Sequence, residues 1–382
     1  MSNRPPLRVL LVSHYYPPHV GGIENVVHHE AVELAAQGAE VTVLTSGERS
    51  CVTVGADGVR VVRVAAWNGP ERRAGVPYPV FSPTLLTAAL REARRADAVH
   101  LHDCLYLSTW SAALAATLTR TPYVLTQHVA VVNHPSWLVK TVQRAFYGVV
   151  GRLLLRRARA VLTMNARVAA FVRGLGAPAE RTRHLPNGVD IELFRPARDL
   201  TERQLIRKRL GLPADRVLAL FVGRFVPKKG YDILLDAHGQ QADYDLVFAG
   251  DGDASALAGH PGVHHLGALP PDVIAEAYRA CDLFALPSTD EGFPLSVQEA
   301  MASGLPLVTT DDPGYAPYGL DRDRVCLLPR RARELGETLD ALAADEDRRR
   351  AMGQYARAYA ERDFAWPEHA AALVELYGGG VR

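Results

Sequence analysis

Cysteine is scarce in this sequence, and long apolar runs are missing. The four cysteines among 382 residues are scattered and show no CxxC or metal-ligand spacing. Disulfide frameworks and zinc sites depend on such spacing, so neither class is indicated. No run of 18 apolar residues occurs, and the polar start leads directly into a strand pattern. We therefore expect a cytoplasmic protein with reduced thiols, no secretory signal and no transmembrane helix. The cysteines are Cys51, Cys104, Cys281 and Cys326.

An excess of charge of one sign is also missing. Lysine and arginine number 43 against 42 aspartates and glutamates, which leaves a net charge of +1. This balance gives no reason to expect a nucleic-acid partner, because such proteins usually carry a strongly basic face. Two phosphate-binding fingerprints, GxGxxG and GxxxxGK[ST], are absent as well. A phosphate site in this chain must be built in another way.

What the chain does have is a regular alternation of short apolar runs and amphipathic segments. This pattern is typical of α/β proteins with buried parallel strands, and 382 residues are enough for two domains. Turn residues in 185–196 indicate the boundary between them. The predicted strands are 8–12, 41–45, 59–64, 98–102, 123–126, 160–164, 217–222, 245–249, 263–266, 283–286 and 305–309. The predicted helices are 23–37, 83–95, 106–118, 167–173, 201–210, 231–237, a short one from Ser296, a charged helical stretch over 331–362, and 366–377.

The stretch 287–310 carries the strongest functional signal. A strand ends at Pro287, a loop brings Glu291, and a short helix brings Glu299, with seven residues between the two glutamates. A helix N-terminus beside the carboxyl end of a strand offers unpaired N–H groups to a phosphorylated ligand. Two simpler interpretations remain open. Glu299 fits a capping box with Ser296, and Glu291 fits a solvated loop residue.

Three other loops follow predicted strands and are candidates for the same ligand. Gly21 and Gly22 precede the first helix and let a ligand approach the backbone, although an ordinary turn has the same composition. His128 lies just past a strand end, where a structural histidine is the alternative. The loop 223–230 combines Arg224 with two lysines and suits a diphosphate, although loop cations are usually just solvated.

Two further groups of residues were considered as metal sites. Asp251 and Asp253 are spaced like a carboxylate pair, but we interpret them as part of a turn. His264 and His265 are adjacent in a strand and so point to opposite faces, which argues against a shared metal.

These segments resemble the retaining nucleotide-sugar glycosyltransferases of glycosyltransferase family 4, which have the GT-B fold. The phrases that carry the resemblance are YYPPHVGGIENVV at 15–27, TQHV at 126–129, LPNGVDIELFRP at 185–196, GRFVPKKG at 223–230 and EGFPLSVQEAMASGLPLV at 291–308. The resemblance implies two Rossmann-like doubly wound domains with a deep cleft between them. Residues 1–188 would bind the acceptor, 189–363 the nucleotide sugar, and a helix over 364–382 would pack back on the first domain.

The resemblance also implies a role for individual residues. Arg224 and Lys229 would hold the diphosphate, Glu299 the ribose and Leu269 the nucleobase. Glu291 and His128 would be the catalytic pair. The remaining donor-binding residues would be Gly22, Gly292, Phe293, Pro294 and Leu295. The sequence departs from the family at two places. Gly38-Ala39 stands where many relatives have Gly-His, and we interpret this difference as structural. The segment 311–315 lacks the family's commoner Gly-Gly turn on the donor side.

The implied reaction moves a sugar from a UDP- or GDP-sugar to a hydroxyl of a small-molecule, lipid-linked or glycan acceptor. It would retain the anomeric configuration by front-face displacement, with no metal and no cofactor. Alternatives are an epimerase or a phosphorolytic enzyme of the same fold, and a catalytically silent sugar-nucleotide-binding protein. Acceptor specificity is expected in the loops near Tyr15, 67–78, Asp103 and His134.

A basic amphipathic segment at 136–159 permits two interpretations. Its arginines and apolar residues suit a helix on the inner face of a membrane, or a domain helix with a solvated basic face. The second is favoured, and Gly148 and Gly151 weaken a single rigid helix.

Overall fold

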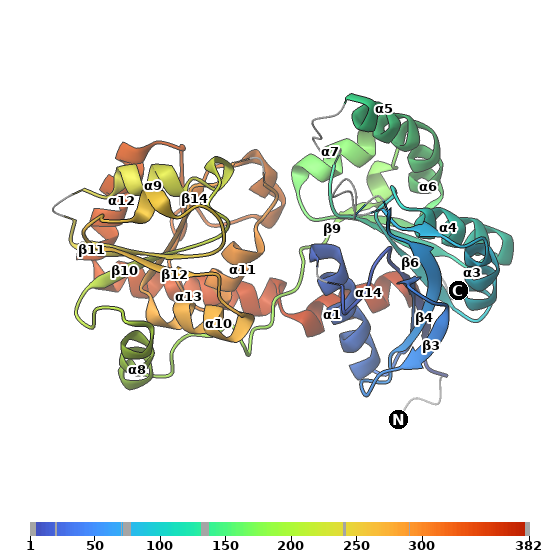
Figure 1. Ribbon diagram of the computed structural model, residues 1–382, viewed down its shortest axis with the longest axis horizontal. Coiled ribbons are helices and arrows are strands. Elements are labelled where there is room, and N and C mark those ends of the chain that lie inside the picture. Colours follow the sequence, from blue (N-terminus) through green and yellow to red (C-terminus); the bar gives the residue numbers. More distant parts are fainter. Residues whose placement is uncertain are drawn as a thin grey trace. The chain divides into compact units, whose positions relative to one another are not determined.

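The computed structural model describes residues 5–19, 21–69, 71, 78–130, 137–239, 242–289 and 291–378. The chain divides into two compact units. Unit 1 comprises residues 1–188 together with 366–382, and unit 2 comprises residues 189–365. Each unit is an α/β fold around its own sheet (Figure 1).

Unit 1 is built on a sheet whose strand order is β3-β4-β2-β1-β6-β7-β8-β9, with β5 paired to β4. Neighbours from β2–β4 through β8–β9 are parallel, and β3 and β5 pair with β4 in the antiparallel sense. The strands are β1 Arg8–Val12, β2 Glu40–Gly47, β3 Cys51–Val54, β4 Arg60–Trp67, β5 Val80–Phe81, β6 Ala98–His102, β7 Tyr123–Gln127, β8 Ala160–Thr163 and β9 Thr182–His184.

Helices cover both faces of this sheet because its central strands are apolar on both sides. On β1, Val9 and Leu11 face one hydrophobic cluster, and Leu10 and Val12 face another. The first cluster includes α1 and α14, and the second includes α3 and α4. The helices are α1 Gly22–Ala36, α3 Thr84–Ala93, α4 Leu107–Thr119, α5 Trp137–Phe146, α6 Arg152–Arg157, α7 Ala166–Gly174 and α14 Trp366–Gly378, with a π-helical turn at Tyr147–Gly151 and a 3-10 turn at Ala179–Arg181.

Unit 2 is built on a six-stranded, fully parallel sheet with the order β12-β11-β10-β13-β14-β15. All residues of β11 and β13 are buried, as expected of strands covered on both faces. The strands are β10 Val217–Val222, β11 Tyr244–Ala249, β12 Val263–Gly267, β13 Leu283–Leu286, β14 Leu307–Thr310 and β15 Cys326–Leu328. The helices are α8 Leu200–Leu210, α9 Tyr231–Ala237, α10 Pro271–Ala280, α11 Leu295–Ala302, α12 Ala332–Ala344 and α13 Glu346–Asp363, with 3-10 turns at Pro227–Lys229, Ser255–Leu257 and Pro313–Tyr318.

The predicted α/β class with parallel, Rossmann-like sheets is confirmed, and so are most elements. The charged stretch 331–362 forms two helices, because the Asp345 side chain accepts from the Arg348 N–H at 2.9 Å and caps a new helix. Helix α10 and the exposed strand β3 were not predicted. Within the described part of the chain, no helix combines the length and the apolar character needed to cross a bilayer.

Candidate functional site

The carboxyl edge of the unit 2 sheet has one position where the chain reverses its direction of travel across the sheet. From β10 the chain moves outward to β11 and β12, and it then returns to β13 on the other side of β10. Such a switch point opens a crevice between the two strand ends, and ligands of open α/β sheets bind there. The predicted site residues of unit 2 follow β10 and β13, so they belong to the loops that flank this crevice.

Lys229 and Glu291 meet at this switch point. Lys229 Nζ lies 2.7 Å from Glu291 Oε2, although 62 residues separate them in the chain. Their side chains are only 18% and 15% exposed, so the ion pair is sheltered from water. The backbone reinforces the contact, because the Thr289 N–H donates to the Lys228 carbonyl at 2.9 Å.

A glycine makes this close approach of the two loops feasible. Gly230 has a φ of +76°, a left-handed conformation that favours glycine. A Cβ atom there would also lie 2.3 Å from the Pro287 carbonyl oxygen. The same carbonyl accepts a hydrogen bond from Arg330 Nε at 2.9 Å, which holds the second loop in place. Gly230 therefore lets the loop that carries Lys229 pack against the loop that carries Glu291.

Arg224 differs from Lys229 in its surroundings. Its side chain is exposed, and within the described ranges no acceptor bonds to its guanidinium group. Lys228 is also exposed. The loop after β10 thus presents one unpaired planar cation beside one paired ammonium group.

The N-terminus of α11 lies directly after Glu291. Pro294 is its N-cap and provides no side-chain hydrogen bond to the first turn. The first N–H groups of a helix have no intrahelical acceptor, so those of α11 are available to an anion or a hydroxyl. Phe293 is buried and stacks on Tyr318 with ring centroids 4.0 Å apart. Its side chain therefore anchors the loop, and only its backbone is available to a ligand.

Glu299 is not a capping residue, so the capping-box interpretation is wrong. The helix begins at Leu295 with Pro294 as its cap, which places Ser296 inside the first turn. Instead, the Tyr278 hydroxyl lies 2.9 Å from Glu299 Oε2. Burial raises the pKa of Glu299 to about 7, against the opposing effect of the Tyr278 hydrogen bond. The carboxyl is a half-buried acceptor that titrates near neutrality.

The other predicted positions of unit 2 follow the neighbouring strands. Leu269 is half-buried just after β12, three strand spacings from β13 and so about 14 Å away along the edge. Asp251 and Asp253 accept N–H bonds from Gly252 and Ser255, each at 2.9 Å. These two carboxylates close turns, in agreement with the turn interpretation. Likewise Asp312, in the segment that departs from the family, accepts from the Gly314 N–H at 2.7 Å and caps a turn.

Unit 1 has a switch point of its own, between β1 and β6. Two residues that were not predicted meet near it: the rings of His14 and Tyr106 stack 3.6 Å apart at an angle of 3°. Gly22 is the first residue of α1, and a Cβ there would meet nothing within 4 Å. The space beside this backbone is open. The rule that ligands gather at strand ends would have identified His14, which follows β1 by two residues.

His128 lies one residue past β7 and is buried. Its Nε2 is 3.0 Å from Nδ1 of His102, on the neighbouring strand β6. Burial lowers the pKa of His128 to about 3, and the nearby His102 adds to this effect. The ring is therefore neutral at physiological pH. Among the acceptor loops, His134 and most of 67–78 lie outside the described residues, as does Ser136 of the basic segment.

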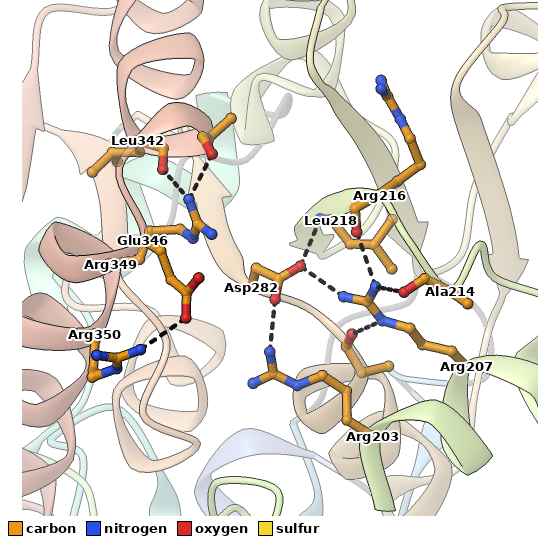
Figure 2. Close-up of polar contacts among 12 residues, drawn as sticks. Arg203, Arg207, Ala214, Arg216, Leu218, Asp282, Leu342, Glu346, Arg349 and Arg350 are labelled. Carbon is orange, nitrogen blue, oxygen red and sulfur yellow. Dashed lines mark hydrogen bonds and ion pairs between the residues drawn. The ribbon is translucent and has the colours of Figure 1, made fainter. Parts of the chain in front are cut away.

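A cavity of about 650 Å³ lies at the opposite, amino edge of the unit 2 sheet, beside the starts of β10, β13 and β14. Figure 2 shows its arginines: Arg203 and Arg207 converge on Asp282, each at 2.7 Å, and Arg349 donates to the Leu342 carbonyl at 2.6 Å. These cations hold helix ends and the sheet together. Because they are already paired, volume alone does not make this cavity the functional site.

The comparisons with known proteins cover both units. The family model described as "Glycosyl transferase 4-like domain" matches residues 21–188, and the one described as "Glycosyl transferases group 1" matches residues 202–359. The chain is 33% identical to a D-inositol 3-phosphate glycosyltransferase of Xylanimonas cellulosilytica, over 95% of this chain and 92% of that protein.

Two solved structures are similar over nearly the whole chain. Sucrose-phosphate synthase from Thermosynechococcus elongatus aligns with a TM-score of 0.71 and 22% identity, over 98% of each chain. HepE from Anabaena, solved in complex with UDP-glucose, aligns with a TM-score of 0.69 and 20% identity, over 98% of this chain and all of that chain. At these identities the likeness concerns the fold.

Proposed function

The chain belongs to the group 1, family 4-like glycosyltransferases of the GT-B fold, and from that premise we propose that it transfers a sugar from a nucleotide-diphosphate sugar to a hydroxyl group with retention of configuration. The observation that carries the proposal is the meeting of Lys229 and Glu291 at the switch point of unit 2. It brings a cation for the diphosphate and a carboxylate for the sugar to one place.

The diphosphate is held by the loop after β10. A lysine ammonium group has three N–H donors, and Lys229 uses one of them on Glu291. Two donors remain for phosphate oxygens, and the unpaired fork of Arg224 adds a bidentate contact. Together these cations stabilise the charge that develops on the departing diphosphate, so the reaction needs no metal.

The sugar and the nucleoside are bound on either side of the diphosphate. Glu291 and the backbone of Gly292–Leu295 hold the sugar hydroxyls, since the carboxylate accepts and the free N–H groups donate. Glu299 accepts from the ribose hydroxyls, and Leu269 packs against the base. UDP- or GDP-sugars are the proposed donors, and the UDP-glucose bound by HepE favours UDP as the first to test.

The proposed chemistry is a front-face displacement. The bond between the anomeric carbon and the diphosphate oxygen breaks, and the acceptor oxygen bonds to the same face of that carbon. The acceptor proton passes to the leaving phosphate oxygen, so charge and atoms balance without an enzymatic nucleophile. Glu291 is poorly suited to attack the sugar, because its carboxylate is already bonded to Lys229.

Unit 1 contributes to the binding of both donor and acceptor in this proposal. Gly22 leaves open space beside its backbone, and His128 supplies a neutral ring nitrogen to a substrate hydroxyl. The relative that is 33% identical is named a D-inositol 3-phosphate glycosyltransferase, so a hydroxyl of a phosphorylated polyol is the first acceptor to test. Tyr15 and Asp103 are the described residues of the expected acceptor loops.

We also propose that the basic segment contacts an anionic lipid surface. Its described part is one helical run, α5 through α6, with a π-helical turn at the predicted weak glycines. Trp137 and Val149 are each 74% exposed, and the same helical run carries the exposed Arg152 and Arg156. A helical run that exposes both apolar side chains and cations is suited to the interface of an anionic membrane.

Release of nucleoside diphosphate, measured with and without an acceptor, tests the function. We expect release from UDP-glucose or GDP-mannose to need a polyol acceptor such as D-inositol 3-phosphate and to be unaffected by EDTA. Arg224→Ala should lower the rate roughly 10²- to 10³-fold, while Arg350→Ala, on the amino-edge cavity, should not change it. Release that needs inorganic phosphate in place of the polyol would favour the phosphorolytic alternative, and conversion to another nucleotide sugar without net release would favour the epimerase. Binding without either reaction would favour the silent protein.

A further inference from the structure

A chain of buried polar side chains runs through unit 1 from its C-terminal helix to His128. Glu30 lies on α1, His102 on β6, and His369 on α14, and each is less than a tenth exposed. Figure 1 shows α14 against α1, and both helices contribute to one hydrophobic cluster beside the sheet. Nothing in the proposed reaction so far uses Glu30, His102 or His369, yet burying them is costly unless their partners are fixed.

The hydrogen-bond partners of His369 indicate where its protons lie. Its Nδ1 lies 2.9 Å from the Pro186 carbonyl oxygen, which can only accept, so Nδ1 carries a proton. Its Nε2 lies 3.0 Å from Glu30 Oε1. Burial alone would raise the pKa of Glu30, but His102 and His100 outweigh it and hold the pKa well below its usual range. One proton lies in the contact between His369 Nε2 and Glu30 Oε1, and the second carboxyl oxygen of Glu30, Oε2, is left as an acceptor.

The second oxygen of Glu30 faces the next ring. Glu30 Oε2 lies 3.3 Å from His102 Nε2, and a proton on this nitrogen would point at the carboxylate. With its proton there, His102 presents a bare Nδ1 that can accept from the Nε2–H of His128 across 3.0 Å. That arrangement leaves His128 Nδ1 bare. No described residue bonds to this nitrogen, so it is available as an acceptor.

We propose that Glu30 and His102 are positioning residues that hold His128 in its Nε2–H tautomer, so that Nδ1 accepts a hydrogen bond from a substrate hydroxyl. The inference rests on the proposed role of His128 and adds how that role is enforced. Because His128 is neutral near pH 7, the tautomer and not the charge decides whether Nδ1 accepts or donates. In the other tautomer, Nδ1 of His128 would carry a proton and could not accept a hydrogen bond from the substrate hydroxyl.

The same cluster contains three groups with the spacing of metal ligands, Glu30, His100 and His102. One contact argues against a metal there. The Tyr377 hydroxyl lies 2.7 Å from His100 Nδ1, the atom that would have to ligate. That nitrogen is already engaged in a hydrogen bond, so it is not free to ligate a metal ion.

Two substitutions of His102 separate positioning from a merely structural role. Asparagine places its oxygen near the site of Nδ1, so His102→Asn keeps an acceptor for His128 and loses the donor to Glu30. Glutamine reaches the site of Nε2, so His102→Gln keeps the donor to Glu30 and loses the acceptor for His128. We expect His102→Gln to lower kcat/KM about 10- to 100-fold and His102→Asn to stay within a few fold of wild type. A residue that only satisfies Glu30 would give the reverse order.

The tautomer itself can be measured without any substrate. In the full chain with ¹⁵N-labelled histidine, long-range ¹H–¹⁵N correlation spectra distinguish protonated from bare ring nitrogens, and His128→Gln assigns the resonances. We expect a protonated Nε2 and a bare Nδ1 in wild type and in His102→Asn, and a mixture in His102→Gln. The exposed His260→Gln is the matched control and should change neither spectra nor rate.

These outcomes distinguish the proposed hydrogen-bond relay, which runs from Glu30 through His102 to His128, from the proposed function. A bare Nε2 in wild-type His128, identical spectra in both His102 variants, or a bound metal found by elemental analysis would overturn the relay. Unchanged turnover in His128→Ala would instead remove His128 from the proposed function, whatever its tautomer. Melting temperatures of both His102 variants show whether a lost rate reflects a lost fold.

Discussion

At the scale of single residues, Glu299 gives the clearest dependence on pH. Burial raises its pKa to about 7 in the free protein. A carboxylate accepts from two ribose hydroxyls, but a protonated carboxyl offers fewer acceptors, so nucleotide affinity should fall as the pH drops below 7. One proton per ligand limits the change to about tenfold per pH unit. Titration calorimetry with UDP at pH 6, 7 and 8 measures it.

The matched variant is Glu299→Gln, which keeps the size of the side chain and cannot titrate. Its affinity for UDP should be weaker than that of wild type at pH 8 and nearly constant from pH 6 to 8. If the variant and the wild type show the same dependence on pH, another group is responsible and the ribose assignment is wrong.

Candidate residues could be predicted where they follow an apolar run that marks the end of a strand. Their hydrogen-bond partners could not be predicted where these come from distant segments of the chain. Glu291 and Lys229 could be placed in the site because each follows an apolar run. The contact between them could not be predicted, because it depends on β10 and β13 being neighbours in the sheet, and the sequence alone does not give the strand order. The Tyr278 contact of Glu299 was hidden for the same reason. By contrast, successive side chains of a strand point to opposite faces, so His100 and His102 of β6 lie on one face of the sheet. This could have been predicted from the sequence.

At the scale of elements, the helical run from α5 to α6 carries a prediction about membranes. We expect the protein to sediment with vesicles that contain anionic phosphatidylglycerol and not with pure phosphatidylcholine. Binding should weaken as salt is raised, because the arginines act through screened attraction. Trp137→Ser with Val149→Ser should reduce it, since both side chains are 74% exposed and remove little from the core.

A matched control for these two substitutions is available on another element. Val54→Ser on β3 changes a residue that is 66% exposed and far along the chain from any basic helix. Vesicle binding that is equal for anionic and neutral lipid, or equally sensitive to Val54→Ser, would contradict the membrane proposal.

Elements with a strong apolar pattern were predicted closely, and those with a weak one were not. Strands β1, β6, β10 and β13 agree residue for residue because each is a short apolar run with turn residues at its ends. Strand β3 is exposed throughout and is held by pairing with β4, so its own residues carry little signal. The division of 331–362 depended on one capping aspartate within a continuous charged pattern.

At the scale of the whole molecule, both units share one topological feature, a switch point in the strand order of the sheet. Each parallel sheet reverses its strand order once, and the loops beside the reversal carry the polar residues. Unit 2 places cations and carboxylates there, which suits a charged donor. Unit 1 places neutral histidines there, which suits hydroxyl groups. The sequence predicted both sheets, and the family resemblance implied that the C-terminal helix returns to unit 1. The individual contacts that hold α14 there, through His369 and Tyr377, join residues some 280 to 340 positions apart and could not be predicted.

The central claim is that a nucleoside diphosphate binds at the switch point of unit 2 through Lys229. Its most direct test is a calorimetric titration of UDP into wild type, Lys229→Ala and Lys228→Ala, with melting temperatures to confirm folding. Loss of charge-assisted bonds costs about 1.5–3 kcal/mol, so Lys229→Ala should bind UDP roughly 10- to 100-fold more weakly. The exposed neighbour Lys228→Ala should bind like wild type. Equal losses in the two variants, or full affinity in Lys229→Ala, would contradict the claim.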